Sequence, residues 1–411
     1  MFAGFVPSGG VASVRTSARS VNDRVSGARV AVRRNGASTT VRMTAAVPST
    51  NAKSLVGATV APNPEFEKFA KPPPFTMEEV RKAIPQECWR KDATKSTMYL
   101  LRDLVTIAVL AAIAVKAANP LVWALYTLAQ GTLFWALFVV GHDCGHGSYS
   151  NSSLLNEIVG HLTHASILVP FHGWRISHRT HHANHANVDK DESWYPYSKK
   201  DYDEMSLSRR MFRFELPVAL FGYPVYLFKN TPNKTGSHWL PGSRLFKPSE
   251  AGMVVRSTLS CIAMLGLLAA VGAKIGLAML AKLYMGPLVV FWAWLAAVTY
   301  LHHTDESVPS YRNEEWNYFR GALSTVDRDF GPLIDSVHHH IGWHVVHHTF
   351  PQIPHYNLVK ATEAVKPVLG EYYREPERSG FMPWHLVRSL GDSFKKCRWV
   401  DNEGDVVFYK H

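Results

Sequence analysis

Three short stretches of this chain concentrate histidine at helical spacing. They read HDCGH (142–146), HRTHH (178–182) and HVVHH (344–348). Positions three and four apart lie on one face of a helix, so each stretch aims its imidazoles at a single point. The candidate metal ligands and catalytic residues are therefore His142, His146, His178, His181, His182, His344, His347 and His348.

Eight imidazoles aimed inward are too many for one metal ion and predict two. Imidazole binds zinc, copper, iron and nickel alike, so the ligand set alone does not identify the metal. The four cysteines lie far apart and form no CxxC pair, which argues against a zinc–thiolate site. The predicted site is therefore built from nitrogen ligands only.

Four apolar stretches are candidates to cross the hydrocarbon core of a bilayer, which takes about 20 residues. Asn119 and Pro120 form a tight turn between the first two, and a second turn is expected near Lys282. Residues 211–228 are also apolar, but the charges and prolines within them favour an interfacial or re-entrant segment. The predicted spans lie near 99–118, 121–140, 253–273 and 285–301.

Two hairpins of spans place all three histidine stretches on the same side of the membrane, as a shared metal site requires. The sequence thus predicts an all-α membrane protein: four transmembrane helices in two hairpins, with a histidine-rich, two-metal cap on one side. A metal transporter would carry ionisable ligands at mid-membrane, whereas these stretches lie at span ends or outside the spans. A zinc membrane hydrolase stays open until the metal is identified.

The first 46 residues contain seven Arg, no Lys and one acidic residue, and they are rich in Ser, Thr and Ala. An Arg-rich, Ser-rich and acid-poor start is typical of an organellar transit peptide. The alternative is a basic tail that binds nucleic acid or anionic lipid, but such tails usually cluster their charge and use Lys. We predict a transit peptide at 1–46, a linker at 47–75 and a single membrane domain at 76–411.

The histidine stretches and their surroundings resemble the membrane fatty acyl desaturases. The segments GHDCGHGSYS (from 141), VGHLTHASILVPFHGWRISHRTHH (from 159), DESW (from 191) and HHTFPQIPHY (from 347) are similar to the plastid omega-3 desaturases of plants and green algae. Thr304 and Asn357 instead lean toward the related omega-6 enzymes. An omega-6 (delta-12) desaturase or an acyl hydroxylase with the same metal core is therefore the alternative.

The resemblance implies a diiron cap and an O2-dependent oxidoreductase. Removing hydrogen from unactivated methylenes needs a metal that activates O2, and zinc is redox-silent. The implied reaction introduces a cis double bond three carbons from the methyl end of dienoic acyl chains on plastid glycerolipids. Such chains would pass from 18:2 to 18:3, or from 16:2 to 16:3.

Electrons for this reaction must come from a separate protein, because the chain has no nucleotide-binding glycine fingerprint and no haem-bearing extension. In a plastid membrane, envelope or thylakoid, ferredoxin is the expected donor. Basic residues near the C-terminus could steer an acidic donor, with contact to the membrane surface as the alternative. They are Arg374, Arg378, Lys395, Lys396 and Arg398.

A ninth nitrogen ligand is expected near the end of the fourth span. His303 is the first choice, and His302 and His338 are the alternatives. Histidine ligands also need an acceptor for the ring nitrogen that does not bind metal. The carboxylates nearest to the histidine stretches in sequence are Asp143, Asp191 and Glu192.

Overall fold

The computed structural model describes residues 63–117, 119–194, 196–208, 210, 216–229, 236–380 and 383–411, all within one compact unit. The predicted transit peptide and the first part of the predicted linker, 47–62, lie outside the described residues. Within the described ranges the chain is mostly helical, as predicted, and its strands are one short antiparallel pair, β1 (Ser310–Tyr311) and β2 (Val406–Val407).

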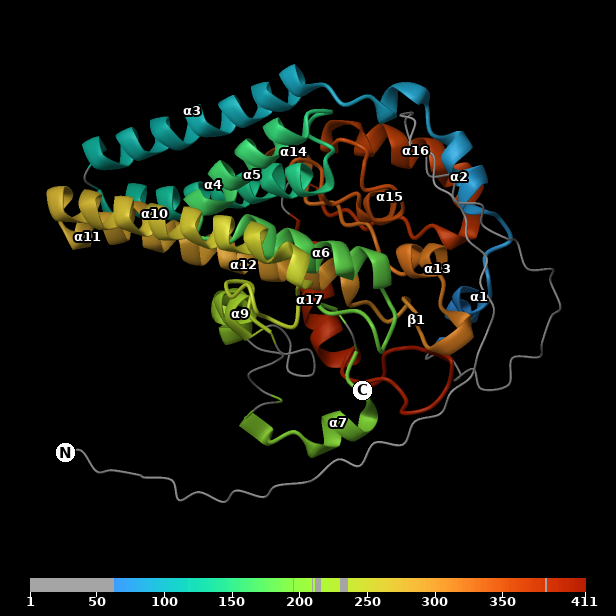
Figure 1. Ribbon diagram of the computed structural model, residues 1–411. Helices are drawn as coiled ribbons and strands as arrows, with labels where there is room; N and C mark the ends of the chain where they lie inside the picture. The colour runs from blue at the N-terminus through green and yellow to red at the C-terminus, as the bar shows by residue number, and fades with distance from the viewer. Residues whose placement is uncertain are drawn as a thin grey trace, which may run out of the picture. The chain divides into compact units, whose positions relative to one another are not determined.

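Four helices in the described part of the chain are long and apolar enough to cross a membrane. Figure 1 shows them as the long coils at one end of the ribbon. Each helix overlaps one of the four predicted spans and is longer than that span. The helices are α3 (Ala93–Ala117), α4 (Pro120–His146), α10 (Ala251–Ile275) and α12 (Gly286–His303), the last preceded without a break by α11 (Leu277–Leu280) and the π-helical turn η4 (Ala281–Met285).

The pair α4 and α12 forms the centre of the membrane part. Gly131 makes their close approach possible, because a Cβ there would lie 2.6 Å from the Pro287 carbonyl oxygen of α12. The large side chains of α4 between Leu133 and Val140 are buried, whereas α3 and α10 expose Leu, Val and Ile along their length. The outer two helices therefore present their apolar faces to lipid.

One of the two hairpin turns lies where the sequence predicted it, and the other does not. The side-chain oxygen of Asn119 caps α4 by accepting a hydrogen bond from Leu121 N at 2.8 Å, at the Asn-Pro turn that the sequence predicted. The second turn lies at Gly276, with φ of +85°, so its prediction near Lys282 was wrong. A turn at this φ favours glycine, whereas Lys282 is helical and extends its ammonium over the Trp123 ring.

Labelling of single cysteines tests this topology. A thiol placed at Asn119 or Gly276 is expected to react only from the membrane side opposite to a thiol placed at Lys199. The four native cysteines are all buried, so they give little background. Labelling of either turn from the Lys199 side would contradict the two-hairpin arrangement.

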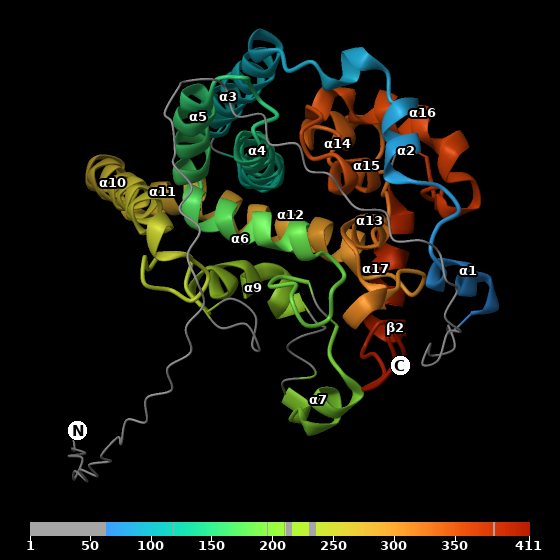
Figure 2. The same cartoon turned by 45° about the vertical axis from the view of Figure 1, so that its right-hand side comes forward.

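Shorter helices build the part outside the spans. Figures 1 and 2 both show α2, α13, α15 and α16 gathered at the end away from the α11 turn. The bounds are α1 (Glu67–Ala70), α2 (Met77–Ala83), α5 (Ser153–Ser166), α6 (Phe171–Asn184), α7 (Lys199–Glu204), α9 (Leu216–Lys229), α13 (Tyr318–Leu323), α14 (Pro332–Val337), α15 (His344–Thr349), α16 (Leu358–Leu369) and α17 (Trp384–Lys396). Single 3₁₀ turns lie at Pro64–Phe66, Gln86–Trp89, Pro248–Glu250, Asn313–Glu315, His355–Asn357 and Gly370–Tyr372.

Two segments pack against the rest of the chain more closely than the sequence indicated. Residues 63–75 were predicted as linker, but Phe69 is buried there against Tyr311 and Phe408, so this part belongs to the packed unit. The apolar segment predicted as interfacial contains α9, which buries Tyr223 and Leu227 in the main core. Its other face exposes Phe221, Val225 and Phe228, which fits a helix at the edge of the membrane.

Candidate metal centre

Four helices deliver the histidines to one region. The first stretch forms the last turn of α4, so the membrane span itself carries His142 and His146. The second stretch lies on α6 and the third on α15. His303 is the last residue of α12, the central partner of α4. The packing of α4 against α12 therefore places His142, His146 and His303 relative to one another. The shorter helices α6 and α15 supply the remaining histidines.

Five imidazoles form a first group whose ligand atoms all lie within 4.8 Å of one another. The Nε2 atoms of His142 and His347 are 3.1 Å apart, and those of His146 and His178 are also 3.1 Å apart. His182 Nε2 lies 3.1 Å from His178 Nε2. Nitrogen atoms that face one another at this distance converge on a single point, as ligands of one ion do.

Five further imidazoles form a second group around His303. His303 Nδ1 lies 3.0 Å from His185 Nε2, and His303 Nε2 lies 3.3 Å from His344 Nε2. Candidate ligand atoms of His181 and His348 lie within 4.8 Å of the His303 ring nitrogens. The two groups are adjacent, because the rings of His182 and His348 stack at 4.1 Å.

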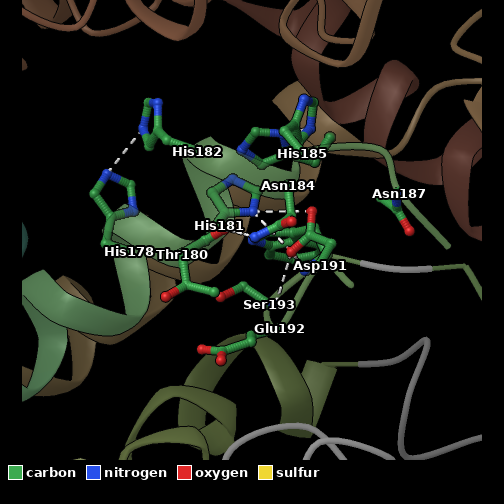
Figure 3. A network of polar contacts seen from close by, with 12 residues as sticks. His178, Thr180, His181, His182, Asn184, His185, Asn187, Asp191, Glu192 and Ser193 are labelled. Carbon is green, nitrogen blue, oxygen red and sulfur yellow. Dashed lines mark hydrogen bonds and ion pairs between the residues drawn. The ribbon is translucent and has the colours of Figure 1, made fainter. Parts of the chain in front are cut away.

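Hydrogen bonds to fixed acceptors define which nitrogen carries the proton in three of these rings. His181 Nδ1 lies 2.9 and 3.0 Å from the two oxygens of Asp191, the contact drawn in Figure 3. His185 Nδ1 donates to the Gly321 carbonyl at 2.8 Å, and His344 Nδ1 donates to the Ile341 carbonyl at 3.3 Å. In each ring Nε2 therefore keeps a lone pair for a metal ion.

Burial keeps most of these rings neutral. Burial is the main cause and the charge of neighbouring imidazoles is the second: together they lower the pKa of several histidines of the three stretches well below the usual range. Burial also lowers the pKa of His185 to about 4. Neutral imidazole is the form that binds metal, so the groups are ready to bind at neutral pH. Among the histidines outside the membrane spans, this applies to His178, His182, His344, His347 and His348.

The donor set fits two metal ions. Buried polar atoms normally have hydrogen-bond partners, yet His181 Nε2 and both ring nitrogens of His348 have none in the described structure. Unpartnered nitrogens inside a cluster of lone pairs are what a bound cation would satisfy. The first group offers five nitrogens to one position, and the second group consists of two sets of three nitrogens that share His303.

The three carboxylates singled out in the sequence take different places. Asp191 orients His181 and also accepts from the backbone N–H groups of Ser193 and Trp194. Asp143 lies 3.4 Å from His142 Nδ1. Glu192 accepts from the Ser177 hydroxyl and is drawn apart from the imidazoles in Figure 3.

The structure adds His185 to the residues considered from the sequence. Its number continues the second stretch by one helical turn beyond His181, and that spacing was the available signal. The alternatives for a ninth ligand lie outside the two groups. His302 donates to the Val326 carbonyl and stacks on His344, and His338 packs against Trp294.

Comparisons with known proteins cover the part of the chain that carries the histidines. A model of the fatty acid desaturase family matches residues 118–378, which include every histidine of the two groups, and a domain of unknown function (DUF3474) matches residues 13–112. A chloroplastic omega-3 fatty acid desaturase of Glycine max is 54% identical over 350 residues, 84% of this chain and 77% of the relative.

Two further relatives differ in their stated location. The chloroplastic sn-2 acyl-lipid omega-3 desaturase (ferredoxin) of Arabidopsis thaliana is 54% identical over 341 residues, 82% of this chain and 76% of the relative. An omega-3 fatty acid desaturase of the endoplasmic reticulum of Nicotiana tabacum is 51% identical over 348 residues, 84% of this chain and 91% of the relative. The chain is therefore a member of the fatty acid desaturase family.

Proposed function

We propose that this chain is an omega-3 acyl-lipid desaturase of a plastid membrane. It would convert 18:2 to 18:3 acyl chains, or 16:2 to 16:3, by adding a cis double bond three carbons from the methyl end. The observation that carries the proposal is the convergence of imidazoles from three histidine stretches on two adjacent positions. The similarity to omega-3 desaturases over more than four fifths of the chain supports the acyl position.

Two iron ions suit these positions. Imidazole nitrogens would hold both ions. The ligands of one ion would be His142, His146, His178, His182 and His347, and those of the other would come from His181, His185, His303, His344 and His348. Bound iron would supply the O2 activation that no side chain provides. The overall reaction takes one hydrogen from each of two adjacent methylenes and consumes O2, two electrons and two protons, giving the alkene and two waters.

The surrounding side chains keep the centre dry and the ligands in place. The buried ring of Trp174 stacks on His178 at 4.3 Å, and the Trp194 ring lies over His303 at 5.7 Å. These indoles shield the imidazoles from bulk water, which would quench a strong oxidant. Asp191 holds His181 with Nδ1 protonated, so that Nε2 stays directed at the metal position.

The relatives also support a choice of electron donor and of location. One of them is named as a ferredoxin-dependent chloroplastic enzyme, and we infer the same donor here. In the predicted basic patch, Arg374 already has partners within the chain: its guanidinium carbon lies 3.9 Å from the centre of the Phe69 ring, and it donates to the Ser307 carbonyl. Lys395 and Arg398 are exposed and remain available to an acidic partner.

Expression in a host that makes 18:2 but no 18:3 lipid tests the proposal. Chromatography of the fatty acids is expected to reveal 18:3 with its new double bond three carbons from the methyl end. Conversion of 18:1 to 18:2 with 18:2 left untouched would establish the omega-6 alternative, and a hydroxylated chain would establish the hydroxylase. Purified protein should contain about two irons per chain, whereas zinc alone would indicate a hydrolase.

A further inference from the structure

A buried carboxylate lies in the first membrane helix, where none is needed for insertion. Asp103 is only 1% exposed, although the rest of α3 mostly faces lipid. Ionisable groups in a span are costly and usually serve a function through a specific partner. Arg102 binds one carboxylate oxygen of Asp103 at 2.8 Å. The other oxygen lies 2.7 Å from Nε2 of His339, which is fully buried.

His339 stands at an unusual point of the backbone. It and His340 both have positive φ, at +52° and +54°. Residues with a side chain rarely adopt this conformation, and two in succession require support from outside the turn. The contact with Asp103 supplies support from the membrane helix, and the Asp335 carbonyl supplies more by accepting from His340 N at 2.9 Å.

The turn leads directly into the third histidine stretch. Ile341 follows it, and the Ile341 carbonyl is the acceptor for His344 Nδ1 at 3.3 Å. That bond decides which nitrogen of His344 carries the proton, and it directs His344 Nε2 toward His303 Nε2 at 3.3 Å. A shift of the turn would therefore move the acceptor that orients a ligand.

The same histidine also reaches the first stretch. The ring of His339 lies 4.5 Å from the ring of His355. The backbone N–H of His355 donates to Asp143 at 3.2 Å, and Asp143 lies 3.4 Å from Nδ1 of His142. The buried pair of Asp103 and His339 therefore lies next to groups that hold His344 in the second group and His142 in the first.

We propose that Asp103 is a positioning residue of the metal centre, which acts from the membrane through His339 on the third histidine stretch. The contact fixes the left-handed turn, the turn places the Ile341 carbonyl, and the carbonyl orients His344. The inference rests on the proposed function only in that the centre holds iron. It does not depend on which carbon pair is desaturated.

The variant Asp103→Asn tests it in the full-length, iron-loaded enzyme purified in detergent. Asn has nearly the same shape but lacks the charge that holds His339. Changes in groups that support metal ligands typically cost about 10–100-fold in affinity or activity. We expect kcat to fall by about that factor with KM for the lipid unchanged, iron release to a chelator to accelerate by about tenfold, and the Mössbauer quadrupole splitting of one iron to change.

His339→Phe provides a second route to the same result. Phenylalanine keeps an aromatic ring beside His355 but cannot bind Asp103, so the same losses are expected. The double variant should be no worse than the worse single variant, because both remove one contact. Thr106→Val, one turn further along α3, is the matched control, since the Thr106 hydroxyl donates only to the Arg102 carbonyl of its own helix.

Unchanged kcat, iron release and Mössbauer spectrum in His339→Phe would overturn the proposal, even where Asp103→Asn fails to insert. Losses that simply add in the double variant would also overturn it, because they would assign the two residues independent roles. The wild-type fatty acid profile tests the proposed function separately. An enzyme with another acyl specificity would still show the coupled effect on iron release.

Discussion

Replacing His182 by Ala is expected to abolish desaturation. His182 Nε2 belongs to the first group of nitrogens, and its ring stacks at 4.1 Å on His348 of the second group. The substitution therefore removes one ligand and the packing that joins the two positions. Activity should fall by more than about 100-fold, since even the loss of a ligand's supporting partner costs about 10–100-fold. Product chromatography and iron analysis of the purified protein measure both effects.

The chain should still insert into the membrane, because α6 lies outside the four long helices. His161→Ala is the matched control. His161 lies on α5, is partly exposed and contacts the Ser260 hydroxyl at 3.1 Å, away from both groups. It should keep near-normal activity and iron. Full activity in His182→Ala would contradict the assignment of this ring as a ligand.

The sequence predicted those features that depend on short-range spacing. Apolar length identified the four spans, and the i, i+3, i+4 spacing placed each histidine stretch on one helix face. The capping box of α2, in which Thr76 and Glu79 exchange hydrogen bonds, is a further local feature of this kind. These signals are local, so packing against distant elements did not alter them.

Features set by long-range contacts could not be predicted in the same way. His185 lies just past the end of α6 and meets His303 across 118 residues of sequence. Only the packing of α6 near the end of α12 makes that pair. The left-handed turn at His339 could not be predicted either, because a positive φ is uncommon even for histidine, which adopts it more often than most residues.

Replacing His185 by Ala is expected to remove iron from the second position and to leave the first occupied. The Gly321 carbonyl fixes the proton on His185 Nδ1, so Nε2 offers its lone pair beside His303. None of the five first-group nitrogens belongs to His185. The iron content of the purified variant should fall from about two per chain toward one, and desaturation should be lost because O2 reduction requires both ions.

His302→Phe is the control that makes this prediction specific. His302 is as buried as His185 and adjoins His303 in sequence, but it donates to the Val326 carbonyl and stacks on His344 at 4.3 Å. Phenylalanine preserves the stack and loses one hydrogen bond, so iron content should stay near two. Equal iron loss in both variants would mean that packing around His344, rather than ligation by His185, holds the second ion.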